Sequence, residues 1–435
     1  MIRIILSVVL LAMSTMAFAE ELSADEQRMA DWIDAHVDEA VALLKETVDI
    51  PSGTLNTAGV REVGDVMRRE LDALGMRTEW VDMPDEMNRA GHVFGRKDGN
   101  GKKFLLIGHL DTVFEIEDGS RPFESDGEVA TGHGVYDMKA GNVIIVYALR
   151  ALQEVGALTD IPIVVAYTGD EEKSGRPLSI SRKEFIEAGK WADIALGFEE
   201  AMYFDDTDWA TVARRSSSRW ELTVEGKQAH SQGIFSDKTG AGAIFEAARI
   251  LNAFYDEVRG PEHLTFNAGT IQGGTEVAYD AGENRGTTFG KTNVVPRKVV
   301  VHGGMRTISM EQLDWARETM RSIVADNHPH TTATITFTDS YPPMSPTEGN
   351  LALQRELSVI NVALGREPMP ALDPSRRGAA DISYVAPYTD ALAGLGGIGG
   401  GGHTPDENIA LSSIPLAIKR AAILIYRLSQ QEATD

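Results

Sequence analysis

The 435-residue sequence contains no cysteine. Disulfide bonds and thiolate metal ligands are therefore excluded, so any bound metal has to be held by histidine and carboxylate side chains. Positive charge is also scarce, because 41 Lys and Arg residues stand against 65 Asp and Glu residues, giving a formal net charge of −24. Such an acidic surface repels nucleic-acid phosphates and anionic lipids, which argues against both as partners.

Long hydrophobic runs are missing as well. The apolar stretch from Ile4 to Met13 is too short to span a bilayer, and it follows a positive charge at Arg3. The "AFA" that ends at Ala19 matches a small-x-small cleavage site. We therefore predict a signal peptide over residues 1–19 and a periplasmic or secreted mature protein that has no membrane association.

The chain is too long for one ordinary core, so two domains are expected. In "KKFLLIG", "IPIVVAY" and "ADIALGF" we expect buried strands, which alternate with helices such as "NVIIVYALRALQEVG". This alternation predicts an α/β domain with a mostly parallel sheet covered on both faces. We assign residues 20–215 and 341–435 to this domain.

The pattern changes near residue 216. "SRWELTVEG" alternates apolar and polar residues, as a half-exposed antiparallel strand does. Helix and strand patterns then follow each other as far as "TTATITFTD". Residues 216–340 therefore form a predicted α+β insert of the order β-α-β-α-β, a small sheet with two helices on one face.

Several acidic and histidine side chains follow the predicted strands, start a helix or lie in a late loop. Taken singly, such a residue is more often a structural histidine, a helix cap or a solvated charge. Together they form the ligand set that zinc, cobalt or manganese prefers at the carboxyl edge of an open sheet. These residues are His109, Asp111, Asp137, Glu171, Glu172, Glu199 and His403.

Five motifs in this order resemble the metal-binding motifs of the M20 metallopeptidases: "HLDTV", "GVYDMKAGN", "TGDEEKSG", "GFE" and "GGGGH". The resemblance covers nearly the whole mature chain, including the insert, and is strongest to the glutamate carboxypeptidase branch, which is carboxypeptidase G2-like. It implies a zinc-peptidase catalytic domain and an inserted domain that acts as lid and dimerisation domain. We call residues 216–340 the lid.

The resemblance also implies a role for each candidate, with two zinc ions per subunit. His109 and Glu199 would hold one zinc ion, Glu172 and His403 the other, and Asp137 would bridge them. Asp111 would orient His109 through its second ring nitrogen. Glu171 would be the general base that takes a proton from the bridging water.

This assignment gives the adjacent carboxylates Glu171 and Glu172 different tasks. Neighbouring residues of an extended chain point in opposite directions, so one can face the metals while the other faces the substrate. Nearby cations would offset the repulsion between the two charges.

In the lid, the resemblance implies that His230 approaches the scissile carbonyl, often from a partner subunit. Asn293 and Arg306 would bind the carbonyl and carboxylate region of the substrate. The local chemistry agrees, because a histidine can stabilise an oxyanion and an arginine binds carboxylates through two hydrogen bonds. A homodimer formed through the lid is therefore expected.

The predicted reaction releases a C-terminal amino acid from an N-acyl amino acid or a short peptide. An aminopeptidase or dipeptidase of the same fold, and a metal- or peptide-binding protein without catalysis, are the alternatives. Aromatic residues, Trp209 and Tyr341, stand where the branch suggests basic ones. Arg214 and Arg215 are nearby and could substitute. The aromatic residues nevertheless argue against glutamate as the released residue and favour an apolar or aromatic one as the alternative.

Overall fold

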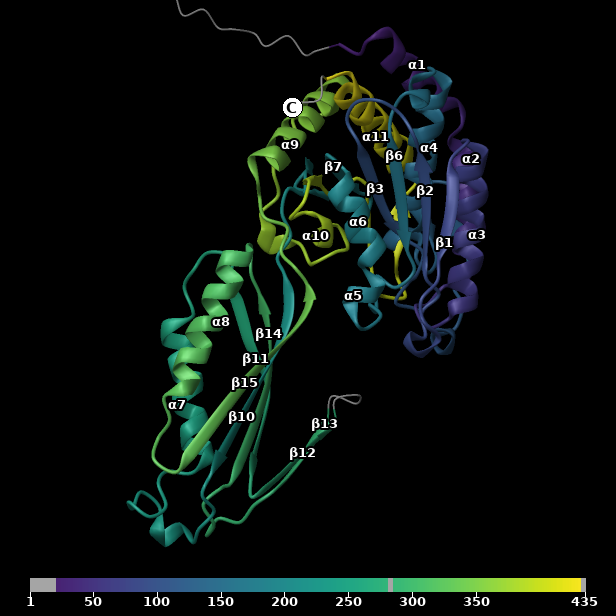
Figure 1. Cartoon of the computed structure of the whole chain (residues 1–435). Helices are drawn as coiled ribbons and strands as arrows, with labels where there is room; N and C mark the ends of the chain where they lie inside the picture. The colour runs from purple at the N-terminus through teal and green to yellow at the C-terminus, as the bar shows by residue number, and fades with distance from the viewer. Residues whose placement is uncertain (1–20, 281–284, 432–435) are drawn as a thin grey trace, which may run out of the picture.

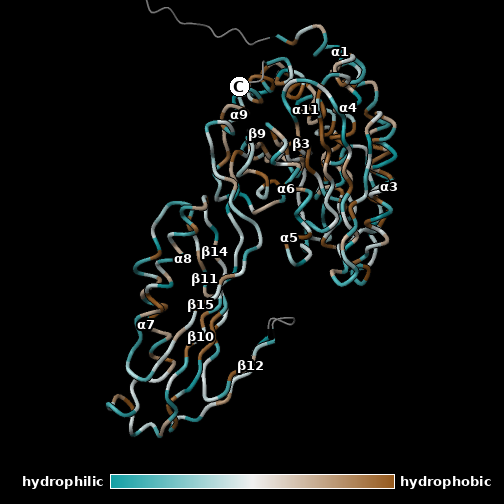
Figure 2. Tube along the Cα trace, viewed as in Figure 1, coloured by the Kyte–Doolittle hydropathy of each residue, from teal (hydrophilic) through white to brown (hydrophobic). Residues whose placement is uncertain are grey.

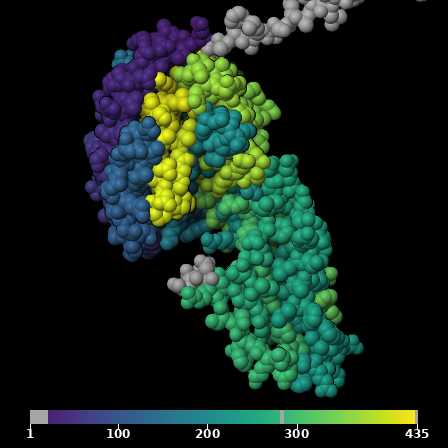
Figure 3. Space-filling view, turned by 180° about the vertical axis from the view of Figure 1, so that it is seen from behind, coloured from purple at the N-terminus to yellow at the C-terminus, as the bar shows by residue number. Residues whose placement is uncertain are grey.

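The computed structural model describes residues 21–280 and 285–431. The predicted signal peptide lies outside this part of the chain. The described residues form two bodies, an α/β domain that contains the first and the last described residues and a lid that projects from it (Figures 1 and 3).

The α/β domain is built on a six-stranded sheet with the strand order β1-β2-β6-β3-β7-β16. The pairs β3–β6, β3–β7 and β7–β16 are parallel, whereas β1–β2 and β2–β6 are antiparallel. The predicted mostly parallel sheet is thus confirmed. Its strands are β1 (Arg77–Val81), β2 (His92–Lys97), β3 (Phe104–His109), β6 (Ile163–Thr168), β7 (Ile194–Gly197) and β16 (Asp390–Leu392).

Helices cover both faces of this sheet, as alternate residues of β3 show. Phe104 and Leu106 pack into the core under one set of helices, and Leu105 and Ile107 pack into the core on the opposite face. Figure 2 shows the apolar residues along β3, α4 and α11. The first core contains α1 (Ala24–Ala35), α2 (Val37–Val48), α3 (Thr57–Ala73), α4 (Ala140–Glu154), α9 (Glu348–Ala363) and α11 (Ser413–Gln430); α5 (Leu178–Ser181), α6 (Lys183–Trp191) and α10 (Ile382–Val385) lie on the other face.

The lid contains a four-stranded antiparallel sheet of order β11-β14-β10-β15 with two helices on one face. The sequence predicts three strands, and the fourth, β11, corrects that prediction. Three glycines and a mostly exposed surface hide the alternation expected of a strand there. The elements are β10 (Ser217–Gly226), α7 (Ala243–Glu257), β11 (Thr265–Gly274), β14 (Lys298–Arg306), α8 (Met310–Ala325) and β15 (Thr331–Tyr341), plus a hairpin of β12 (Glu276–Asp280) and β13 (Arg285–Phe289).

Two small sheets complete the α/β domain. One is the hairpin β8 (Met202–Phe204) and β9 (Thr207–Trp209). The other has the order β17-β18-β5-β4, with β4 (Glu124–Ser125), β5 (Val129–Thr131), β17 (Gly399–Gly400) and β18 (Asn408–Ala410). By pairing β18 with β5, this sheet brings the late glycine-rich loop against a segment far earlier in the chain.

Two chain crossings join the lid to the α/β domain. Arg214 and Met344 pair in an isolated bridge, and the backbone N–H of Ser216 donates to the carbonyl of Thr307 at 2.7 Å. Within the described ranges, the helices are too short or too polar to cross a bilayer.

Candidate active site

The predicted metal ligands gather at one edge of the main sheet. His109 is the last residue of β3, Glu172 follows β6, and Glu199 follows β7. These strands are parallel, so their carboxyl ends meet at the same edge. Asp137 lies in the irregular turn before α4, and His403 in the loop between β17 and β18.

Asp137 links the two histidines through different oxygen atoms. Its Oδ1 lies 3.2 Å from Nε2 of His109, and its Oδ2 lies 3.1 Å from Nε2 of His403. The same His403 nitrogen is 3.2 Å from Oε2 of Glu172. Asp137 therefore lies between the two histidines, as a ligand that bridges two metal positions would.

The chemistry of this cluster fits divalent metal ions. One ligand atom each from His109, Asp137 and Glu172 lie within 4.8 Å of one another. Oε1 of Glu172 is buried without a hydrogen-bond partner, which is costly unless something positive binds it. Histidine and carboxylate donors without thiolates are the set that zinc, cobalt or manganese accepts.

The electrostatics of the cluster also favour added positive charge. Hydrogen bonds to the carboxylates of Asp137 and Glu172 raise the pKa of His403 to about 11. Burial alone lowers the pKa of His109, but Asp111 and Asp137 raise it well above its usual value. Burial raises the pKa of Glu172 to about 7. The carboxylates that stabilise the protonated histidines would therefore also stabilise a bound cation.

Asp111 is fully buried and fixes both glutamates of the "DEE" loop. Its Oδ1 accepts from the backbone N–H of Glu171 and its Oδ2 from that of Glu172, both at 3.1 Å. The hydroxyl of Thr54 donates to Oδ2 at 2.6 Å. Nδ1 of His109 lies 3.0 Å from the main-chain carbonyl of Asp111 and 3.5 Å from its carboxylate. The main chain of Asp111 thus contributes to holding this histidine, beyond the predicted carboxylate contact.

Glu171 lies beside the cluster without joining it. Burial raises the pKa of its carboxyl well above the usual value, and the charge of Glu199 adds to this effect. The Tyr341 hydroxyl, at the end of the lid's last strand, donates to the main-chain carbonyl of Glu171 at 2.5 Å. The lid junction therefore contacts the segment that carries the predicted base.

Two buried arginines hold the carboxylates of the "FEE" segment. Nη2 of Arg214 lies 2.6 Å from Oε2 of Glu199, and Nη2 of Arg377 lies 2.9 Å from Oε2 of Glu200. Glu199 is thus paired with an arginine instead of joining the His109 cluster, and its role as a metal ligand stays a prediction. Neither arginine contact was foreseen from the sequence.

Glu407 is a further residue that the motifs did not indicate. It is buried and accepts hydrogen bonds from the backbone N–H groups of Gly134, Tyr136 and Asp137 at 2.8–3.0 Å. The only sequence signal is its position four residues after His403 in "HTPDE". It ties the loop of His403 to the turn that presents Asp137.

The three predicted lid residues lie at two different places on the lid. β10 starts at the junction, and its ten residues extend about 33 Å away from it. His230 follows the far end of β10, and the backbone N–H of Ser231 donates to the carbonyl of Asn293 at 2.9 Å. Arg306, in contrast, ends β14 at the junction. His230 and Asn293 are therefore neighbours at the tip of the lid, whereas Arg306 lies at the junction.

The aromatic positions also have different surroundings. Trp209 stacks on Phe204 in the β8–β9 hairpin, with 5.0 Å between ring centroids. Tyr341 reaches the Glu171 segment. Of the arginines considered as substitutes, Arg214 binds Glu199, while Arg215 donates to Thr265 in the lid at 3.1 Å.

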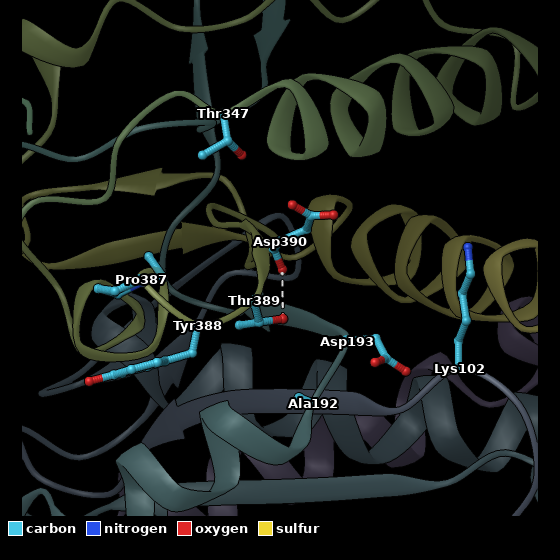
Figure 4. Close-up of a pocket in the computed structure, with 9 residues that line it drawn as sticks. Lys102, Ala192, Asp193, Thr347, Pro387, Tyr388, Thr389 and Asp390 are labelled. Atoms are coloured by element: carbon cyan, nitrogen blue, oxygen red, sulfur yellow. Dashed lines mark hydrogen bonds between the residues drawn. The ribbon is translucent and has the colours of Figure 1, made fainter. Parts of the chain in front are cut away.

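A cavity of about 500 Å³ lies at the edge of the main sheet that is opposite to the cluster (Figure 4). Lys102 lies two residues before β3, Asp193 lies directly before β7, and Asp390 begins β16, so this cavity is at the amino ends of these strands. Ligands of open α/β sheets bind at the carboxyl ends, where His109 and Glu172 lie. We therefore assign the chemistry to the cluster and not to this cavity.

Comparison with known proteins places this chain among the metallohydrolases. A model of the peptidase family M20/M25/M40 matches residues 105–427, so the chain belongs to this family. It is 26% identical over 429 residues to carboxypeptidase G2 of Pseudomonas sp. (strain RS-16), with 95% of each chain covered. The resemblance drawn from the five motifs is confirmed.

Solved structures agree with the fold. A tripeptidase of Staphylococcus aureus matches with a TM-score of 0.65 and 18% identity, over 93% of this chain and 99% of that one. A dinuclear metal-binding peptidase of the M20 family from Bacillus subtilis matches with a TM-score of 0.61 and 15% identity, over 91% and 99%. The protein is thus an M20 hydrolase of the peptidase or amidohydrolase type, built from an α/β domain and an inserted lid.

Proposed function

We propose that this protein is a di-zinc hydrolase that cleaves the amide bond of N-acyl amino acids or short peptides and releases the C-terminal amino acid. The observation that carries the proposal is the division between Glu172 and Glu171. Glu172 lies in the cluster with Asp137 and His403, while Glu171 is half-buried beside it and makes no ion pair within the described part of the chain. One site would then contain both the metal ligands and a separate carboxylate for proton transfer.

His109, Asp137, Glu172 and His403 would hold the metals, with Glu199 as the fifth ligand once it leaves Arg214. Bound zinc supplies Lewis-acid polarisation of the amide carbonyl and lowers the pKa of water. Glu171 takes the proton of the attacking water on its carboxylate and passes it to the leaving nitrogen. Asp111 keeps the two glutamates in register by binding both of their backbone N–H groups.

We also propose that His230 and Asn293 act on the active site of a partner subunit. They lie at the tip of the lid, about 33 Å of strand from the junction, so they are far from the site to which their own lid is hinged. Arg306 stands at the junction and would serve its own subunit. One site would then use groups from two chains.

The outer face of α7 supports a homodimer formed through the lid. Ile244, Phe245 and Tyr255 are each about half exposed on this helix, and Ile271 is 58% exposed on the adjoining edge strand β11. An apolar helix face beside the edge strand of a sheet is a surface that a second copy can cover. A homodimer would bury these side chains on both copies.

Subunit mixing tests the shared site. E171Q and H230A are each expected to be nearly inactive. A heterodimer of the two would contain one site with both native groups if His230 acts across the dimer, so a mixture recovers about a quarter of the native activity. If no activity returns although heterodimers form, His230 acts within its own subunit.

Product analysis by mass spectrometry tests the reaction itself. The zinc-loaded protein would be incubated with N-acyl amino acids, folate-like conjugates and free dipeptides, with and without chelator. We expect chelator-sensitive release of C-terminal amino acids from the blocked substrates. Cleavage of free dipeptides alone would instead indicate a dipeptidase, and metal binding without any cleavage would indicate a binding protein.

A further inference from the structure

A cluster of arginines lies at the end of the lid sheet that adjoins the junction with the α/β domain. Strands β10, β11 and β14 line a cavity of about 300 Å³ there, and Arg219 and Arg306 are among its lining residues. Arg215 adjoins it, because its Nη1 lies 3.1 Å from Oγ1 of Thr265, another lining residue. The lining residues Ser217 and Arg306 stand at the ends of β10 and β14 that adjoin the junction with the α/β domain.

Strand register brings Arg219 and Arg306 onto the same face of the sheet. Arg219 pairs with Gly304, and Arg306 is two residues further along the same strand. Such diagonal neighbours have Cβ atoms about 7–8 Å apart. Long guanidinium side chains at this spacing can bind two carboxylates that are a few bonds apart in one molecule.

None of these three arginines has a carboxylate oxygen within 4.0 Å among the residues that the structure describes. Elsewhere, arginines such as Arg69 and Arg182 pair with carboxylates.

Nearby acids are occupied. Glu221, two residues after Arg219, lies 3.2 Å from His302, and Asp373, the acid closest to Arg215 in effect, accepts from the backbone of Ser375. Burial and the charge of Arg306 lower the pKa of Arg215. In a chain with a net charge of −24, unpaired positive charges that gather in one cavity indicate a site for an anion.

We infer that this cavity is an anion-binding subsite for a second carboxylate of the substrate, with Arg219 as the residue that selects for it and Arg215 behind it. The inference rests on the proposed function, in which Arg306 serves the site of its own subunit, and on the predicted role of Arg306 in binding the carboxylate region of the substrate. A guanidinium forms two parallel hydrogen bonds to a carboxylate, so a dianionic substrate would engage both Arg306 and Arg219.

The chain geometry connects this subsite to the metal centre. Arg214 and Arg215 are consecutive and point to opposite sides of an extended segment. Arg214 binds Glu199 in the active site, whereas Arg215 reaches Thr265 of the lid. The two sites therefore adjoin the same strand of chain.

The second carboxylate can belong to the released residue or to the acyl group, and two substrate pairs distinguish these sources. N-acetyl-glutamate is compared with N-acetyl-glutamine, and N-succinyl-leucine with N-butyryl-leucine. In the native protein, kcat/KM is expected to be higher for the dianionic member of one pair, and R219Q is expected to reduce this ratio about tenfold. The pair that responds identifies the source. An unchanged ratio in both pairs would overturn the inference.

The lid offers a matched control in Arg321, which pairs with Glu318 on the surface of α8. R321Q should leave both ratios unchanged. A binding measurement separates this inference from the proposed reaction. In E171Q, titration calorimetry with each dianionic compound and its neutral partner should show preferential binding of one dianion, lost in the E171Q/R219Q double variant.

Preferential binding without turnover in the native protein would contradict the proposed function but support the subsite. Turnover without any preference for the dianions would do the reverse.

Discussion

In the catalytic domain, Asp111 and Glu407 each accept three hydrogen bonds through their carboxylates. On the lid, His230 and Arg219 are exposed, and the ring of His230 accepts from the backbone N–H of Gln232. The cluster of candidate ligands is therefore fixed by the same contacts that hold its loops in place. The lid groups stand on a regular sheet and its loops and can change without loosening the fold. We therefore propose that metal binding depends on the stability of the catalytic domain, while substrate preference depends on the lid.

Metal removal should produce the largest effect and should act on the catalytic domain alone. Chelation is expected to abolish hydrolysis and to lower the unfolding temperature, because the buried carboxylates of Asp137 and Glu172 then lose their counter-charge. Metal that binds only the native state at a hundred times its Kd stabilises by about 2.7 kcal/mol. Scanning fluorimetry and activity assays with add-back of zinc, cobalt or manganese measure both effects.

The native protein and R219Q should respond to chelation alike. Hydrolysis that continues after metal analysis has shown complete removal would contradict the assigned site.

E171Q should be next in size. We expect a loss of about 10³-fold in kcat, within the usual range for a general acid–base group, with unchanged metal content. Stopped assays and elemental analysis of the purified variant measure the two quantities. E79Q is a suitable control, because Glu79 is exposed on β1 and makes no ion pair in the described chain. If E171Q lost its metals, Glu171 would be a ligand and not the base.

The sequence predicted the candidate site best where a functional residue lies at the end of a strand. His109, Glu172 and Glu199 follow apolar runs of four to six residues that could be recognised as buried strands, so their common edge could be predicted. Asp137 and His403 could be placed only by resemblance, because a turn and a pairing between β5 and β18 bring them there. Such long-range pairing leaves no local pattern.

Partners of the site residues could not be predicted. Arg214 and Glu407 reach Glu199 and the Asp137 turn across the fold, and nothing in their flanking sequence indicates those contacts. The strand β11 was missed for a different reason: an edge strand with Gly269, Gly273 and Gly274 lacks a buried face that would show alternation. The split of His230 and Asn293 from Arg306 follows from strand direction and requires the sheet topology.

H230A should separate activity from stability. Loss of one group that stabilises an oxyanion costs about 10²- to 10³-fold in kcat. The unfolding temperature should stay the same, because the side chain is exposed. Steady-state kinetics and thermal unfolding are measured on the same sample, with H328A as control, since His328 is an exposed lid histidine on another loop. A lower unfolding temperature for H230A would weaken the contrast between the two regions.

E407Q should have the smallest effect on activity. Its behaviour should lie between that of the catalytic-domain cluster, which is tied to the fold, and that of the exposed lid residues. The amide replaces the oxygen that accepts from Gly134, so the Asp137 turn loses one of three hydrogen bonds. Residues that position ligands typically contribute 10- to 100-fold to metal affinity, and we expect a loss of about tenfold. Competition with a chromophoric chelator measures the Kd, while kcat at saturating zinc should largely recover. E128Q, an exposed change near the same small sheet, serves as control. A kcat that stays low with both metals bound would instead place Glu407 in the chemistry itself.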